Sequence, residues 1–216
     1  MSKQTIWNYF KRHTQLSDEA IAGIMGNFEA ESNNESCRVQ GDFTSDRRVS
    51  KEYAQKVNSG LLPNWAYDAK GFGLAQWTYF SRKQNLMSTA QSYGTGIEDE
   101  VTQIRFFLAE MQTEFVSTWR ALLNRPSILE ATRLVCVNYE RPAVNKVPAR
   151  ADYATTIYNQ FHGHEIGPEP EPEPEPTPTP VPADPDQDWI LDWIEFNEEE
   201  IARLQEKNDE LRRRLK

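Results

Sequence analysis

Residues 17–32 of the sequence read SDEAIAGIMGNFEAES, and they carry the signals of an amphipathic helix. Ser17 is a preferred helix N-cap, and Asp18 and Glu19 follow it in the first turn, where the helix dipole favours acidic side chains. Apolar residues recur along the stretch at helical spacing: Ile21, Ile24, Met25 and Phe28. A stripe of this kind packs against other elements, so the stretch predicts a buried helix around which a domain is built.

The chain on either side of this stretch is also mostly helical in pattern. We expect helices around residues 6–10, over 50–60, over 101–111, over 115–123, from the capping box at 127–130 towards residue 139, and around Tyr153, Ile157 and Phe161. Residues 33–48 are polar and irregular. Six or seven helices with one irregular segment predict a mainly α domain.

A proline-rich segment follows this domain. Residues 168–186 read PEPEPEPEPTPTPVPADPD, and proline at nearly every second position favours an extended polyproline II conformation. At about 3.1 Å per residue such a segment spans on the order of 60 Å, which predicts a spacer. We therefore expect a domain over residues 1–167, a Pro/Glu-rich spacer over 168–186 and a helical tail over 187–216.

The tail repeats its apolar residues every seven positions, as a coiled coil does. One series is Ile194, Ile201, Asn208 and Leu215, and the other is Ile190, Asn197, Leu204 and Leu211. Isoleucine at a, leucine at d and one asparagine at a favour a parallel dimer. A trimer, docking to a virion partner, and packing of an amphipathic helix on its own domain are the alternatives.

Composition excludes several classes of protein. The 216 residues include 24 Lys and Arg against 33 Asp and Glu, and the net charge of −9 lies wholly in residues 168–216. No basic patch indicates nucleic-acid binding, and no apolar run approaches the roughly 18–20 residues that span a bilayer. The first residues, MSKQTIWNYF, lack the features of a signal peptide, so we expect synthesis in a cytoplasm without export by that route.

Cysteine and histidine give no sign of a metal centre. Cys37 and Cys136 are too few for a disulfide framework and lack zinc spacing, so reduced, buried thiols are expected. His162 and His164 form one pair with no third ligand evident. We expect no metal ion and no cofactor.

Two carboxylates lie near the end of the first quoted helix. At 100° per residue, Glu31 flanks one edge of the apolar stripe and Glu29 flanks the other. A carboxyl at the rim of an apolar face is partly desolvated, which suits a general acid. Periodicity does not choose between the two, and two solvated edge residues would show the same pattern.

A second cluster lies in YDAKGFGLAQWTYF, residues 67–80. Two glycines around Phe72 imply a tight backbone, and Gln76, Trp77 and Tyr79 supply an amide and aromatic faces. Sugars are bound by this combination, because their apolar ring faces stack on aromatics while amides meet their hydroxyls. A turn with core aromatics has the same composition.

Three motifs in order resemble the phage tail lysozyme family, which is related to goose-type lysozymes and lytic transglycosylases. They are GIMGNFEAES at residues 23–32, GFGLAQWT at 71–78 and YERPA at 139–143, and the resemblance covers about residues 3–162. It implies a lysozyme-like α+β domain that is mainly α. It also implies cleavage of the β-1,4 bond between N-acetylmuramic acid and N-acetylglucosamine in bacterial peptidoglycan.

The resemblance implies roles for individual residues. The glutamate before the serine of an E-S pair is the general acid in such enzymes, which is Glu31 here, and Glu29 becomes a supporting or solvent-facing residue. The aspartate that positions the attacking water corresponds most closely to Asp68, although it is offset by about one residue. Thr78 stands where goose-type lysozymes have a second aspartate, so Asp42, Asp46 and Glu52 are rivals for the base.

The sugar subsites and the cleft wall follow from the other motifs. Gln76, Trp77 and Tyr79 are expected to line the sugar subsites, and Glu140 is a candidate for the cleft wall or for orienting the catalytic glutamate. A helix end with a local ion pair to Arg141 is the plain alternative for Glu140.

The reaction type and the setting of the enzyme leave alternatives open. Hydrolysis needs one protonated carboxyl and one ionised carboxyl that activates water, whereas a transglycosylase uses the 6-hydroxyl of the sugar and leaves an anhydro product. A noncatalytic glycan-binding or virion structural protein and a peptidase or amidase of the peptide stem are the rivals. We expect a phage or prophage lysin that reaches the cell wall after lysis or as part of a virion.

Overall fold

The described part of the chain is helical. The computed structural model describes residues 3–144 and 146–164. Its α-helices are α1 (Lys3–His13), α2 (Asp18–Ser32), α3 (Arg48–Asn58), α4 (Phe80–Ser92), α5 (Glu100–Thr113), α6 (Val116–Leu123), α7 (Ile128–Val135) and α8 (Val147–Phe161). A 3₁₀ turn lies at Trp65–Tyr67 and a π-helical turn at Cys136–Glu140. The prediction of a mainly α domain is confirmed.

The expected β component is reduced to single bridges. Within residues 3–144 and 146–164 no strand forms, and isolated antiparallel bridges join Phe72 to Val39 and to Trp77. Phe72 and Trp77 exchange both backbone hydrogen bonds, at 3.2 and 2.9 Å, so the chain turns back between them, and no ladder extends from this pair within those residues. The spacer over 168–186 and the coiled coil over 187–216 lie outside the described residues and stay predictions.

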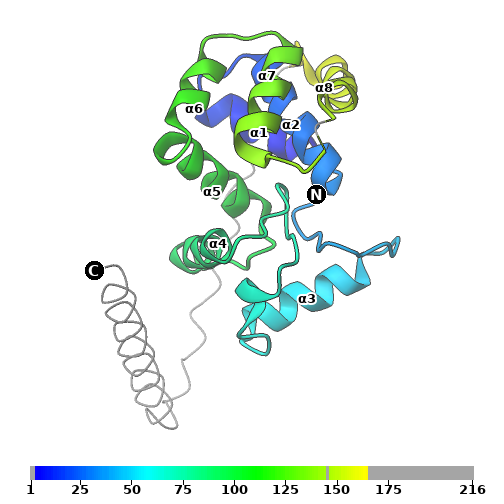
Figure 1. Ribbon diagram of the computed structural model, residues 1–216, viewed down its shortest axis with the longest axis vertical. Coiled ribbons are helices and arrows are strands. Elements are labelled where there is room, and N and C mark those ends of the chain that lie inside the picture. Colours follow the sequence, from blue (N-terminus) through cyan, green and yellow to red (C-terminus); the bar gives the residue numbers. More distant parts are fainter. Residues whose placement is uncertain (1–2, 145, 165–216) are drawn as a thin grey trace, which may run out of the picture. The chain divides into compact units, whose positions relative to one another are not determined.

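The helix that opens the sequence analysis lies at the centre of the helical packing. α2 packs against α1, α7 and α8, as Figure 1 shows, and residues 20–28 of α2 are all buried. Ser17 caps it as expected, accepting a hydrogen bond from the Ala20 N–H at 3.3 Å. None of the helices in the described ranges is long and apolar enough to cross a membrane.

Two glycines in α2 let its neighbours approach closely. A Cβ on Gly23 would lie 2.5 Å from the Ala131 Cβ of α7. A Cβ on Gly26 would lie 2.6 Å from both the Ala154 Cβ and the Arg150 carbonyl oxygen of α8. Atoms do not approach this closely, so a larger residue at either position would force the helices apart. The GIMG motif is therefore a packing motif.

Replacing Gly26 with Ala is expected to destabilise the fold. Glycine to alanine in a helix interior ordinarily stabilises the helix by about 1 kcal/mol, but here the added methyl overlaps α8. Overpacking of this kind costs about 1–3 kcal/mol, which urea unfolding followed by circular dichroism would measure. Ala30→Ser, on the exposed face of the same helix, is the control and should change stability little. A Gly26→Ala variant as stable as the wild type would contradict this packing.

The sequence pattern located seven of the helices in the described residues and missed α4. The predicted helices at residues 50–60, 101–111 and 115–123 correspond to α3, α5 and α6 with small shifts at their ends. α4 was missed because its buried face is Lys83, Leu86 and Ala90, so a charged residue occupies a core position and breaks the apolar period.

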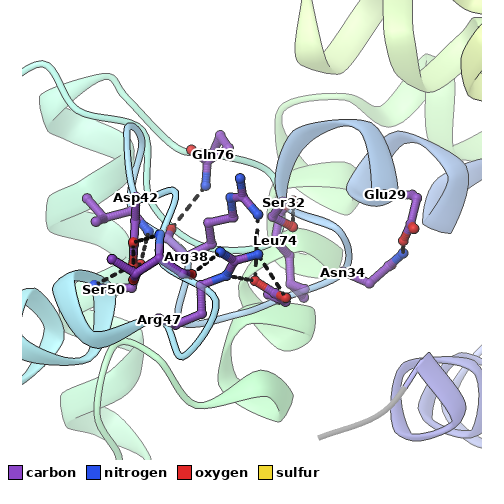
Figure 2. A network of polar contacts seen from close by, with 12 residues as sticks. Glu29, Ser32, Asn34, Arg38, Asp42, Arg47, Ser50, Leu74 and Gln76 are labelled. Carbon is purple, nitrogen blue, oxygen red and sulfur yellow. Dashed lines mark hydrogen bonds and ion pairs between the residues drawn. The ribbon is translucent and has the colours of Figure 1, made fainter.

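The irregular segment after α2 is held by a polar network, which Figure 2 shows in close-up. Both Asp42 oxygens accept hydrogen bonds: Oδ1 from Thr44, and Oδ2 from the Ser50 N–H at 2.8 Å and hydroxyl at 2.6 Å. Burial alone would raise the pKa of the Asp42 carboxyl, but these hydrogen bonds outweigh it and hold that pKa well below its ordinary value. Asp42 therefore fixes the start of α3, whose N-cap Arg47 makes no capping bond of its own.

Candidate active site

A cleft of about 360 Å³ brings together residues from all three sequence motifs. It lies where the C-terminal end of α2, the loop before α4 and the end of the π-helical turn meet. Its lining consists of Glu31, Gln40, Gly71, Ala75, Gln76, Thr78, Tyr79, Arg82, Glu140 and Pro142. Of the predicted site residues, Glu31, Gln76, Tyr79 and Glu140 line this cleft, and Asp68 and Trp77 do not.

The loop opposite Glu31 depends on glycine and on a buried serine. Gly73 has a φ of 78°, and a Cβ there would lie 2.5 Å from Oε1 of Gln103, which accepts a hydrogen bond from the Leu74 N–H. The Ser32 hydroxyl donates to the Leu74 carbonyl at 2.9 Å and so joins the loop to the end of α2. The serine of the E-S pair therefore positions the loop across the cleft from Glu31.

Gln76 and Tyr79 present different surfaces to the cleft. The Gln76 amide nitrogen donates to the carbonyls of Arg38 and Gly73, at 3.0 and 2.9 Å, so its donors shape the loop. Tyr79 is 74% exposed, and it directly precedes the first residue of α4. Its ring is available to a ligand, and the Gln76 amide N–H groups are already engaged.

Trp77 lies in the core. Its side chain is fully buried, and its indole N–H lies 3.1 Å from Oε2 of Glu110 and 3.0 Å from the Tyr139 hydroxyl oxygen. Its ring packs on Phe106 with the centroids 5.2 Å apart. A fully buried ring has no face free for a sugar, and composition alone could not separate Trp77 from the exposed Tyr79.

The structure distinguishes Glu31 from Glu29. Glu31 lines the cleft with its side chain 21% exposed, and its Oε1 pairs with the Arg150 guanidinium of α8 at 2.5 Å. Glu29 is not part of the lining and accepts hydrogen bonds from Lys3 at 2.8 Å and from Asn34 at 2.6 Å. Figure 2 shows Glu29 and Asn34 together, away from Gln76. The helical periodicity did not choose between the two carboxylates. In the structure only Glu31 is placed to contact a ligand in this cleft.

Arg150 is a candidate site residue that the sequence pattern did not indicate. It is buried, and its second amino group lies 3.2 Å from Oδ1 of Asn27, which is itself buried in α2. The Asn27 amide in turn donates to the carbonyls of Gly23 and Thr132. The guanidinium beside Glu31 is thus held by three helices that are distant in sequence.

Glu140 is the second carboxyl group of the cleft. It ends the π-helical turn, and the wide turn closes with the Arg141 N–H on the Cys136 carbonyl at 2.9 Å. Burial, and then the like charge of Glu31, raise the pKa of Glu140 well above its ordinary value. The alternative of a local ion pair to Arg141 is wrong: no such pair forms, and the Arg141 Nε–H donates to the Asn138 carbonyl.

The carboxylate of Asp68 forms an ion pair with the buried ammonium group of Lys83. Its carboxylate contacts Lys83 Nζ at 2.6 Å, the Tyr53 hydroxyl at 2.7 Å and the Lys70 N–H at 2.9 Å. Burial opposes these contacts, but together they lower the pKa of Asp68. Asp68 does not line the cleft, so its carboxylate does not face the position where water would be activated there.

The rival carboxylates are likewise outside the cleft lining. Asp42 belongs to the network before α3, and Asp46 accepts from the Arg48 N–H at 3.1 Å. Glu52 is exposed and pairs with Lys56 at 2.8 Å. Within residues 3–144 and 146–164, no three His, Cys, Asp or Glu side chains gather in a way that could hold a metal ion.

One protein-family model matches the part of the chain that forms the cleft. The family model described as Phage tail lysozyme matches residues 2–161. This range contains every residue that lines the cleft, together with Ser32, Arg150 and the two glycines of α2. No curated protein matches the sequence.

Proposed function

Because the chain belongs to the phage tail lysozyme family, we propose that it is a muramidase that hydrolyses the β-1,4 bond between N-acetylmuramic acid and N-acetylglucosamine. The family supports a lysozyme-like action on peptidoglycan. The observation that carries the proposal is the position of Glu31. It lies at the end of the buried helix α2, and its carboxyl group lines the cleft. In the proposed reaction Glu31 protonates the glycosidic oxygen as the bond to the sugar breaks.

Aromatic side chains beside the cleft support a glycan as the substrate. Tyr79 lines the cleft, and next to it in sequence Phe80 stacks on Tyr67 with ring centroids 5.5 Å apart and an interplanar angle of 9°. All three rings are exposed. Exposed aromatic faces suit the apolar faces of sugar rings, so we propose that the glycan strand contacts Tyr79 and extends towards this pair.

One observation favours a lytic transglycosylase as the second candidate. The carboxyl groups that line the cleft in the described residues are Glu31 and Glu140, and burial, followed by the like charge of Glu31, raises the pKa of Glu140 and so disfavours the ionised form that a base needs. Asp68, the predicted base, is bound to Lys83. Without an ionised carboxylate to activate water, attack by the 6-hydroxyl of the muramic residue would leave an anhydro product.

Digestion of purified peptidoglycan and mass spectrometry of the fragments test the function. Fragments with reducing N-acetylmuramic acid ends support the muramidase, and anhydro-muramic ends support the transglycosylase. New amino termini without new sugar ends would instead show a peptidase or amidase. If no fragments are released at all, the protein is a noncatalytic glycan-binding or structural component.

The proposed setting is a phage or prophage lysin that reaches the cell wall after host lysis or as part of a virion. The family description, which names a phage tail enzyme, supports this setting. A dimer, a trimer or a virion partner held through residues 187–216 stays a prediction, because those residues lie outside the described ranges.

A further inference from the structure

Three carboxyl groups and two guanidinium groups lie in or near the cleft, and Glu31, Arg82 and Glu140 line it. Glu110 of α5 binds Arg82 of α4 through two parallel contacts, at 2.6 and 2.7 Å. Glu110 also accepts a hydrogen bond from the Tyr139 hydroxyl at 2.5 Å, and it is buried. This pair joins one carboxylate to one guanidinium, so its net charge is zero.

The second guanidinium is also paired with one carboxylate, but its buried Nε has no hydrogen-bond partner. Arg150 of α8 pairs with Glu31 at 2.5 Å and reaches Asn27 with its other amino group. No ion pair in the described residues joins Glu140 to Arg82, Arg150 or any other cation. Oε1 of Glu140 is buried and has no hydrogen-bond partner. Three carboxyl groups therefore face two guanidiniums, and Glu140 is the unmatched one.

An unmatched buried carboxylate is costly, so burial favours the protonated form of Glu140. Burial first, and then the nearby charge of Glu31, raise the pKa of Glu140, while Arg150 and Arg82 oppose the rise. The titratable and charged groups that face Glu140 are Glu31 from α2, Arg82 from α4, Glu110 from α5, Arg150 from α8, and Tyr139 and Cys136 from its own turn.

We propose that Glu140 is a positioning residue for Glu31: the two carboxyl groups share one proton against the single guanidinium of Arg150, and this is the proton that Glu31 delivers. The proposal rests on the proposed function. As the glycosidic bond breaks, the proton passes from Glu31 to the leaving oxygen, and Glu31 is left as a carboxylate beside Arg150. The attacking water or sugar hydroxyl then bonds to the sugar carbon and returns its proton to the pair.

The wide turn that carries Glu140 supports this role. Cys136–Glu140 continues α7 as a π-helical turn, and such turns occur frequently at functional sites because they redirect a side chain. Here the turn brings a carboxyl to the same cleft as Glu31 with no cation of its own.

The pH dependence of cleavage by the full chain with Glu140→Gln tests the proposal. Glutamine keeps the shape of the side chain but leaves Glu31 alone with Arg150, so the alkaline limb of the rate profile is expected to move to lower pH. A move of one pH unit lowers the rate on that limb about tenfold, whereas the rate at the acid optimum should change only a few-fold. Glu140→Asp, which keeps the second carboxyl, should restore part of the limb.

A matched control and an opposite outcome complete this test. Glu114→Gln removes an exposed carboxylate beside the neighbouring hollow that Glu140 also lines, and it should leave the profile unchanged. If Glu140→Gln lowers the rate equally at every pH, the residue is merely structural and the proposal fails. An unchanged profile would also overturn it.

A second measurement needs no substrate. In carbon-13 NMR of the full chain, one glutamate carboxyl should titrate well above the ordinary range, be absent from Glu140→Gln, and move to lower pH in Glu31→Gln. If the wild type cleaves glycan but no such carboxyl exists, the shared proton is refuted and the function stands. If the carboxyl titrates as expected but no glycan is cleaved, the proposed function fails and the coupled pair stands.

Discussion

Glu31→Gln is expected to lower the rate of glycan cleavage by about 10²–10⁴-fold, the range that a general acid contributes. Glutamine has no proton to give to the glycosidic oxygen. Its amide oxygen can still accept the hydrogen bond from Arg150, so the packing of α2 against α8 should persist. The rate is measured by release of soluble fragments, and circular dichroism checks the fold.

Glu29→Gln is the matched control for this prediction. It makes the same chemical change two residues earlier on the same helix, at a carboxylate that pairs with Lys3 and does not line the cleft. Its rate should stay close to that of the wild type. Equal fragment release by wild type and Glu31→Gln would show that Glu31 is not the acid. Loss of activity in Glu29→Gln alone would show that the wrong carboxylate has been assigned.

Asp68→Ala is expected to destabilise the protein by about 3–5 kcal/mol, the cost of leaving a buried charge without its partner. Lys83 is 0% exposed, and Asp68 lies 2.6 Å from its ammonium group. Burial lowers the pKa of Lys83, and Asp68 opposes that effect. Urea unfolding would measure the loss.

Two further variants make this prediction specific. Glu130→Ala breaks an ion pair of the same length, 2.6 Å, in which both side chains are largely exposed, and it should cost less than about 1 kcal/mol. Adding Lys83→Met to Asp68→Ala removes the stranded charge and should recover much of the stability. If Asp68→Ala is no more destabilising than Glu130→Ala, the buried pair does not hold the fold.

The double variant also tests the predicted role of Asp68 as base. If the Asp68→Ala/Lys83→Met protein folds and cleaves glycan near the wild-type rate, Asp68 acts only in the structure. A folded double variant that cleaves more than 10²-fold more slowly would support activation of water by Asp68. This test separates a catalytic loss from a folding loss, which the single variant cannot do.

Local sequence signals determined most of the helices because they act within one turn. Ser17 and Ser127 cap α2 and α7 through hydrogen bonds to the N–H groups of Ala20 and Glu130, three residues ahead in each case. Interactions of this range are visible in the order of residues alone. α4 was missed because its core position at Lys83 is made tolerable by Asp68, fifteen residues away, and no local pattern records that pairing.

The sequence predicted the residues of the site less well than it predicted the helices. The order of residues placed Glu29 and Glu31 at the two edges of one apolar stripe, and it grouped Trp77 with Tyr79 by composition. Packing decided which of each pair meets the cleft, because α8 brings Arg150 to Glu31 while Lys3 holds Glu29. Packing also buried Trp77 and left Tyr79 exposed.

The stretch SDEAIAGIMGNFEAES thus determined by itself a capped, amphipathic helix with two glycines and a glutamate–serine end. It did not determine what the glycines and the glutamate meet. Only the folded chain brings α8 against Gly26, Leu74 against Ser32, and Glu140 beside Glu31. The physical reason is that capping and periodicity act over one or two turns, whereas charge and proton sharing depend on groups that are distant in sequence and meet only on folding.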